Sequence, residues 1–261
     1  MAARPLAVVT GASSGIGFEL AKLCVEDGYD VLVCADEPEI RRAAERLGNG
    51  GARVEPVEAD LGTEAGVERL AAAIGGRPVD ALLANAGRGL GHAFLDQDWP
   101  EAKDVVDLNV TGTLSLIHRV GRGMRDRGEG RILITGSTAG YMPGAYQAVY
   151  NATKAFLDSF AYALRNELKE TGVTVTCLMP GPTETEFFDR ADLKDSAVGE
   201  TGMKADPAKV ARDGFEAMKK GRAGEVSGFM NKLQVMFSGV IPETVIAQMH
   251  RHLAETRRDE R

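Results

Sequence analysis

Short apolar runs alternate with amphipathic stretches along most of this chain. The apolar runs lie at residues 6–10, 30–35, 53–59, 79–84, 130–135 and 173–179, and each has the length of a buried strand. The stretches with helical spacing lie at about 18–26, 38–47, 63–74, 100–127, 145–170 and 207–220. A short strand near 225–227 and two helices separated by Pro242 follow. This alternation predicts an α/β fold, with a parallel sheet of about seven strands covered by helices on both faces.

The chain contains no repeat, long linker or low-complexity segment, so we expect one domain over residues 1–261. The mixed, mostly polar segment at about 182–206 is long for a connection inside a compact domain, and such loops often cover a ligand site. We interpret it as a substrate lid. Residues 229–258 are predicted to form a C-terminal helical extension.

Charge and composition narrow the classes of partner. The formal charge of −7 argues against nucleic-acid binding, which depends on lysine and arginine contacts to phosphates. No apolar run is long enough to span a bilayer, and the first residues lead directly into a strand, so we expect no membrane segment, no signal peptide and a cytoplasmic location. Cys24, Cys34 and Cys177 lack metal-ligand spacing and are interpreted as buried apolar residues, with no metal site.

A glycine-rich turn separates the first predicted strand from the first helix. Its pattern is Gly11-x-x-x-Gly15-x-Gly17, and glycines at such a turn let the backbone approach a pyrophosphate. The helix that follows offers unpaired N–H groups and the positive end of its dipole. Strand, glycine turn and helix together indicate a dinucleotide site, although the glycines could serve the turn alone.

Asp36 ends the second predicted strand, 19 residues after Gly17. A carboxylate at this distance is placed to accept hydrogen bonds from an adenosine ribose, and it would repel a 2′-phosphate. Glu37 adds a second negative charge, and the nearest cations along the chain are Arg41 and Arg42. We therefore predict NAD(H) as the favoured cofactor with NADP(H) possible; the alternative is that Asp36 only caps the next helix.

Tyr150 and Lys154 are four residues apart on a predicted helix, so both side chains can reach one small volume. A nearby ammonium favours the phenolate and is expected to lower the pKa of Tyr150 toward the range useful for acid–base catalysis. This pair alone is a weak signal. Polar groups at other strand ends strengthen it, because the carboxyl ends of parallel strands line a common crevice. They are Asp60, Asn85 and Ser137.

Taken in order, these motifs resemble the short-chain dehydrogenase/reductase family, in its compact single-domain branch. The resemblance covers about residues 5–228 and adds Asn109 and Pro180-Gly181 to the motifs above. It implies a Rossmann-type doubly wound sheet. It also implies that Tyr150 exchanges a proton with the substrate oxygen, that Lys154 supports Tyr150 and binds the nicotinamide ribose, that Ser137 holds the substrate oxygen, and that Asn109 helps retain a relay water.

The resemblance further implies a set of cofactor-binding residues. The turn should meet the pyrophosphate, Asp60 and Leu61 the adenine, and the segment from Pro180 to Thr185 the carboxamide. The full set is Gly11, Ser13, Ser14, Gly15, Ile16, Gly17, Asp36, Asp60, Leu61, Asn85, Ala86, Gly87, Tyr150, Lys154, Pro180, Gly181, Thr183 and Thr185. Pro182 departs from the bulky apolar residue often found there, which weakens the assignment of Thr183 and Thr185.

Three functions are compatible with this resemblance. The preferred one is an oxidoreductase that interconverts a secondary alcohol and a ketone or aldehyde of apolar or amphipathic character. The alternatives are an NADPH-dependent 3-oxoacyl thioester reductase and a protein that binds the dinucleotide without turnover. Family members commonly form homodimers or homotetramers through the helices that hold Asn109 and Tyr150. An apolar stripe on the first of these helices is compatible with an interface or with core packing; it comprises Val106, Val110, Leu114, Ile117 and Val120.

Overall fold

A seven-stranded parallel sheet forms the centre of the molecule. The computed structural model describes residues 4–48, 51–197, 204–238 and 241–255. The strand order is β3-β2-β1-β4-β5-β6-β7, and every neighbouring pair is parallel. The strands are β1 (Leu6–Thr10), β2 (Asp30–Ala35), β3 (Val54–Glu58), β4 (Ala81–Ala84), β5 (Gly130–Thr135), β6 (Val173–Met179) and β7 (Gly224–Val226). The predicted α/β fold with a parallel sheet is confirmed.

Both faces of the sheet are buried, which explains the continuous apolar runs in the sequence. Successive side chains of a strand point to opposite faces. Leu6 and Val8 of β1 accordingly belong to one core, while Ala7 and Val9 belong to the other. The two apolar cores therefore share the same strands and hold both helical layers against the sheet.

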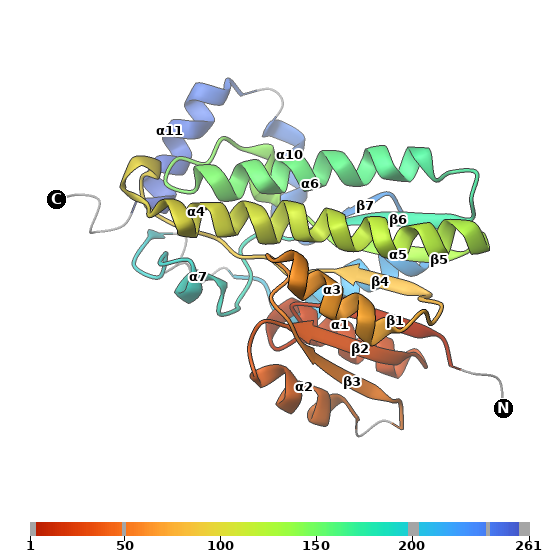
Figure 1. The fold of residues 1–261 in the computed structure, drawn as a ribbon. Helices are drawn as coiled ribbons and strands as arrows, with labels where there is room; N and C mark the ends of the chain where they lie inside the picture. Colours follow the sequence, from red (N-terminus) through yellow and green to blue (C-terminus); the bar gives the residue numbers. More distant parts are fainter. Residues whose placement is uncertain (1–3, 49–50, 198–203, 239–240, 256–261) are drawn as a thin grey trace.

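The helices divide between these two faces (Figure 1). On one face lie α1 (Gly15–Glu26), α2 (Glu39–Leu47) and α9 (Pro207–Lys219). On the other lie α3 (Glu64–Ile74), α5 (Thr113–Arg127) and α6 (Ala148–Glu167), with α4 (Trp99–Val106) packed against α6. The buried cysteines Cys24, Cys34 and Cys177 are free thiols within these cores.

The helix predicted over 100–127 is interrupted in the structure. A π-helical segment, η3 (Asp107–Gly112), joins α4 to α5 and contains the buried Asn109. At the end of this segment the backbone of Gly112 packs directly against the backbone of Leu61. A Cβ added to Gly112 would lie 1.8 Å from the carbonyl oxygen of Leu61. π-Helical segments often occur at functional sites. The regular apolar spacing of this stretch does not reveal the change in helical winding.

Two segments complete the described structure. The region predicted as a lid contains a short helix, α7 (Phe187–Arg190), and its two ends are joined by a bridge between Thr183 and Ala205. Residues 198–203 of this region lie outside the described residues. The C-terminal extension forms α10 (Phe229–Ser238) and α11 (Glu243–Ala254), with residues 256–258 of the prediction outside the described part. Helix α11 lies beside the start of α6 (Figure 1).

Within the described ranges, no helix combines the length and the apolar character required to cross a membrane.

The strand order of the sheet determines where a ligand site can form. The chain leaves β1 and β4, which are neighbours, toward opposite faces of the sheet, so a crevice opens at their carboxyl ends.

Candidate active site

The glycine-rich turn lies at the carboxyl end of β1 and leads into α1. Gly11 and Gly15 have φ of 63° and 55°, a left-handed conformation that favours glycine. A Cβ added to Gly17 would lie 2.0 Å from the carbonyl oxygen of Gly11, so this position also requires glycine. Ser14 precedes α1 in an extended conformation, and its side chain does not cap the helix. The first N–H groups of α1 are therefore available to a negatively charged ligand.

A network of hydrogen bonds connects the ends of three strands next to this turn. The Asn85 amide Nδ2 donates to the carbonyl oxygens of Thr10 and Gly11 at 3.2 and 3.3 Å. The Thr135 hydroxyl donates to Asn85 Oδ1 at 3.1 Å. The Thr10 hydroxyl accepts hydrogen bonds from the N–H groups of Asn85 and Ala86. Thr10 and Thr135, which the sequence reasoning did not select, thus fix the crevice between β1, β4 and β5.

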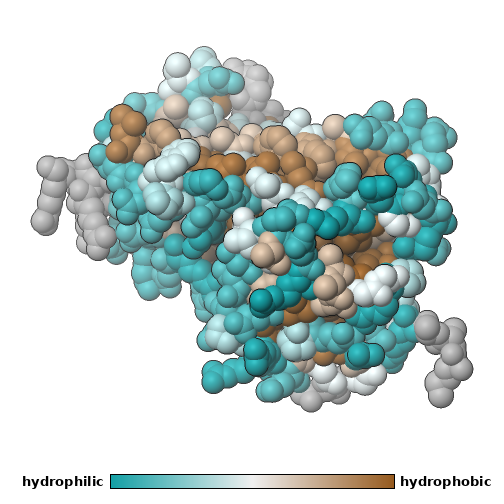
Figure 2. All heavy atoms as spheres, viewed as in Figure 1, coloured by the Kyte–Doolittle hydropathy of each residue, from teal (hydrophilic) through white to brown (hydrophobic). Residues whose placement is uncertain are grey.

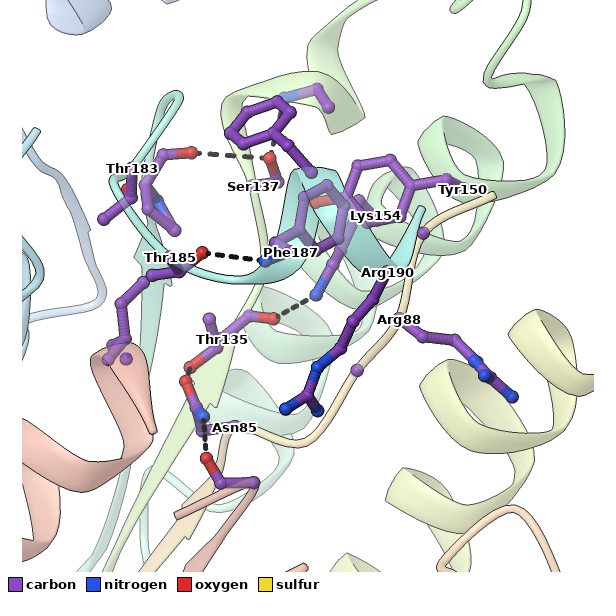
Figure 3. A pocket seen from close by; sticks show the side chains of 18 of the residues that line it. Asn85, Arg88, Thr135, Ser137, Tyr150, Lys154, Thr183, Thr185, Phe187 and Arg190 are labelled. Atoms are coloured by element: carbon purple, nitrogen blue, oxygen red, sulfur yellow. Dashed lines mark hydrogen bonds between the residues drawn. The ribbon is translucent and has the colours of Figure 1, made fainter. Parts of the chain in front are cut away.

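Ser137, Tyr150 and Lys154 converge at the other end of the crevice (Figure 3). Ser137 begins the 3₁₀ helix η4 (Thr138–Tyr141), and its hydroxyl accepts a hydrogen bond from the N–H of Ala139. Tyr150 lies beside Ser137, close enough for the serine to lower the pKa of the phenol. The Lys154 ammonium donates to the carbonyl oxygen of Thr135 at 2.8 Å and lies 5.8 Å from the centroid of the Tyr150 ring.

Burial has the largest influence on the pKa of both Tyr150 and Lys154. It raises the pKa of Tyr150 to about 12, although the neighbouring Ser137 acts in the opposite direction. Burial lowers the pKa of Lys154 to about 8, against the opposing influence of Asp158. The expected lowering of the Tyr150 pKa is therefore not found, because burial of the phenol raises it by more than Ser137 lowers it. At neutral pH Tyr150 is a protonated phenol.

Asn109 lies beneath this group rather than in contact with the cavity. Its Oδ1 accepts from the N–H of Arg88 at 2.9 Å, while Nδ2 donates to the carbonyl oxygen of Arg88 and to the Thr153 hydroxyl. Thr153 immediately precedes Lys154 in α6. The side-chain amide of Asn109 thus ties the loop after β4 to the helix that carries Tyr150 and Lys154.

One cavity of about 460 Å³ contains most of the predicted site. The predicted residues that line it are Gly11, Ser13, Ser14, Gly15, Ile16, Gly17, Asp36, Leu61, Asn85, Ala86, Gly87, Ser137, Tyr150, Lys154, Pro180, Gly181, Thr183 and Thr185. Asp60 and Asn109 are not among the lining residues. Asp60 accepts a hydrogen bond from the N–H of Gly62 and shapes the turn before α3.

Several lining residues come from the lid and from the C-terminal extension. Phe187 of α7 packs against Tyr150, with ring centroids 5.0 Å apart. His250 and Leu253 of α11 also line the cavity. His250 Nδ1 lies 2.9 Å from the carbonyl oxygen of Ala145, and burial lowers the pKa of the imidazole. The sequence pattern marked these segments as helical but contains no signal that brings α11 to the cavity.

Asp158 is a further buried group that the sequence reasoning missed. It lies one helical turn after Lys154, and its Oδ1 accepts a hydrogen bond from the N–H of Ser137 at 3.3 Å. Burial raises the pKa of this carboxyl to about 6. The i, i+4 spacing from Lys154 was the available signal.

The residues present fit a nicotinamide dinucleotide. The glycines of the turn line the cavity and pack too closely against neighbouring protein atoms to carry side chains, and the start of α1 supplies donors for a pyrophosphate. Asp36 lines the same end of the cavity and supplies a carboxylate for ribose hydroxyls. Among the described residues, no group of three or more His, Cys, Asp or Glu side chains is placed to hold a metal ion.

The lowered pKa of Lys154 predicts a pH-dependent stability. Between pH 8 and the ordinary lysine pKa of about 10.4, the unfolded chain binds more protons than the folded chain at this position. The free energy of unfolding contributed by Lys154 therefore rises with pH in this window. From pH 7.5 to pH 10, we expect the wild type to gain roughly 2 kcal/mol relative to Lys154→Met.

Denaturant unfolding at several pH values measures this difference. Lys22→Met, which removes a lysine with a half-exposed side chain, is the control and should follow the wild type. Parallel curves for the wild type and Lys154→Met would contradict a buried, weakly basic Lys154.

Comparison with known proteins agrees with this geometry. Residues 5–195 match the family model described as short chain dehydrogenase. The chain is 38% identical to a putative ketoacyl reductase of Streptomyces coelicolor over 188 residues, covering 69% of this chain and 71% of that protein. It is 33% identical over 205 residues to an NADP-dependent 3-hydroxy acid dehydrogenase of Salmonella typhi, covering 75% and 80%.

A solved structure shows the same similarity. The short-chain dehydrogenase from Sphingobium yanoikuyae in complex with NADPH matches with a TM-score of 0.81 at 25% identity, over 90% of this chain and 93% of that one. The chain therefore belongs to the short chain dehydrogenase family, and it is an oxidoreductase that interconverts an alcohol and a carbonyl compound with a nicotinamide dinucleotide.

Proposed function

We propose that Tyr150 is the proton donor of a carbonyl reduction and the proton acceptor of the reverse reaction. The observation that carries this proposal is the convergence of Ser137, Tyr150 and Lys154 in the cavity that the glycine turn also lines. The dinucleotide, when bound, supplies or accepts the hydride. The protonated Tyr150 phenol is the form that reduction requires.

The neighbouring groups support this transfer. The Ser137 hydroxyl, next to Tyr150, is placed to hold the substrate oxygen, and its backbone is fixed by Asp158. A phenolate forming on Tyr150 would lie close to the Lys154 ammonium, and the attraction between these charges would stabilise it. Lys154 would also donate to ribose hydroxyls, while Asn109 holds the loop and α6 together. The protein thus contributes positioning and proton transfer.

The substrate end of the cavity favours an apolar or amphipathic compound. Met142, Phe187, Phe188 and Leu253 line it, and His250 is the polar group contributed by α11. We propose residues 182–206 as a lid over this end, since Phe187 and Phe188 reach the cavity from α7. An apolar or amphipathic secondary alcohol or ketone fits these walls better than a strongly charged substrate.

NAD(H) is the dinucleotide we propose for this site. Asp36 lines the cavity where the adenosine ribose would lie, and Glu37 follows it. Arg41, the nearest cation along the chain, forms an ion pair with Glu58 at 3.2 Å. Two carboxylates at this position disfavour a 2′-phosphate by charge repulsion.

A 3-oxoacyl thioester reductase that uses NADPH is the second candidate. The observation that favours it is the similarity to the putative ketoacyl reductase, together with the relatives named for NADP(H). The dinucleotide preference separates the two candidates.

The exchange of Tyr150 for phenylalanine tests the proposed chemistry. Tyr150→Phe keeps the ring against Phe187 and removes the hydroxyl, so we expect turnover to fall by roughly 10²–10⁴-fold while dinucleotide affinity changes little. Turnover is measured on a panel of alkyl and aryl ketones that the wild type reduces. Tyr29→Phe, which alters a buried tyrosine just before β2, is the matched control. Wild-type turnover in Tyr150→Phe would refute the assignment.

We also propose that the protein forms a homodimer or homotetramer through the helices on either side of Asn109, α4 and α5, together with α6, which carries Tyr150. Val106 and Phe156 are exposed on these helices, and Phe160 stacks on Phe156 at 6.2 Å. An apolar band covers α5 and α6 on this face (Figure 2). Of the predicted apolar stripe, Ile117 is buried in the core, while Val106 is exposed and would belong to the proposed interface.

Light scattering at micromolar concentration tests this association. The wild type should have the mass of two or four chains, and Phe156→Asp should shift it to one, because a charge in an apolar interface costs several kcal/mol. Met230→Asp, at an exposed residue of α10, should keep the wild-type mass. A wild-type monomer would contradict the proposal.

A further inference from the structure

An ion-pair network connects the lid to the adenosine end of the cavity. Nη2 of Arg190, the last residue of α7, lies 3.0 Å from each carboxylate oxygen of Glu37. The same nitrogen donates to Glu186, one turn earlier in the lid. Arg190 lines the cavity and extends from α7 away from Tyr150 (Figure 3). The lid thus brings a guanidinium to a place that is 153 residues distant along the chain.

Both serines of the glycine turn belong to the same network. The Ser13 hydroxyl donates to Glu37 Oε1, and the Ser14 hydroxyl donates to Glu186 Oε2 at 3.4 Å. Since Glu37 directly follows Asp36, this network surrounds the point where a group on the ribose 2′ position would lie. No arginine or lysine is adjacent to Asp36 in the sequence, but the fold brings Arg190 of the lid to this place.

In this structure the Arg190 guanidinium forms an ion pair with the Glu37 carboxylate. Burial alone would raise the pKa of Glu37, but hydrogen bonds from Ser13 and Arg190 hold it below its ordinary value, so the carboxylate is ionised at neutral pH. An arginine whose guanidinium faces two carboxylates offers little attraction to a further anion. A phosphate dianion, however, is a ligand that arginine binds strongly when its other partners are removed.

We propose that Arg190 is a specificity-determining residue for the dinucleotide, and that Glu37 keeps it from binding a 2′-phosphate. Glu37 then acts against NADP(H) in two ways, by repelling the phosphate and by occupying the cation that would bind it. Glu186 also pairs with Arg190, but it is more exposed than Glu37, so solvent screens this second ion pair more strongly. This inference rests on the proposed function, because it requires the adenosine end of the dinucleotide to lie beside Asp36.

Four proteins test the proposal by fluorescence titration with NADH and NADPH: the wild type, Glu37→Gln, Arg190→Gln and the double variant. Glu37→Gln removes the less exposed of the two carboxylates on Arg190 and leaves only Glu186, so we expect NADPH affinity to rise about tenfold and NADH affinity to change less than about threefold. In the double variant the gain for NADPH should fall below about threefold. Equal melting temperatures show that the variants fold.

A matched control uses the other nearby arginine. Arg41 is held by Glu58, so Glu37→Gln combined with Arg41→Gln should keep the full gain for NADPH. If the gain survives Arg190→Gln instead, Glu37 acts by repulsion alone and the proposal is wrong. It is also wrong if Arg190→Gln weakens NADH and NADPH by the same factor, because Arg190 then binds the pyrophosphate common to both. If no protein binds either nucleotide, the proposed function falls as well.

Discussion

The buried ammonium of Lys154 and its hydrogen bond to the carbonyl oxygen of Thr135 hold the site together. A charged group in a protein interior is tolerated only when polar partners replace water. The carbonyl oxygen of Thr135 is one such partner. The Thr135 hydroxyl donates to Asn85, and the Asn85 amide donates to the carbonyl oxygens of Thr10 and Gly11. The helix that carries the proposed catalytic tyrosine is thereby connected to the glycine turn across the ends of three strands. A dinucleotide bridging this distance would contact one rigid frame.

Much of this arrangement could be predicted because it depends on local spacing. Continuous apolar runs follow from strands buried on both faces, and the positive φ values of Gly11 and Gly15 explain why glycines stand in the turn. The strand ends meet at one edge because the sheet is parallel. These rules located the glycine turn and the polar strand ends, while the resemblance to the family supplied most of the other site residues, and the structure places most of the set around one cavity.

The remaining features depend on contacts between distant segments. The pairing of Arg190 with Glu37 follows from the path of the lid, which no local pattern encodes. The π-helical segment around Asn109 arises where Gly112 meets the backbone of Leu61. The Tyr150 pKa was predicted in the wrong direction because spacing along a helix reports neighbours but not burial. Solvent exclusion by α7 and α11 is a property of the assembled cavity.

The binding of NADH and NADPH to the purified wild-type protein, measured by paired fluorescence titration without substrate, tests the central claim most directly. We predict that both the glycine turn and Asp36 take part, so NADH should bind, and more tightly than NADPH. Tighter binding of NADPH would contradict the role given to Asp36 and Glu37. Failure to bind either dinucleotide would contradict the account of the cavity itself.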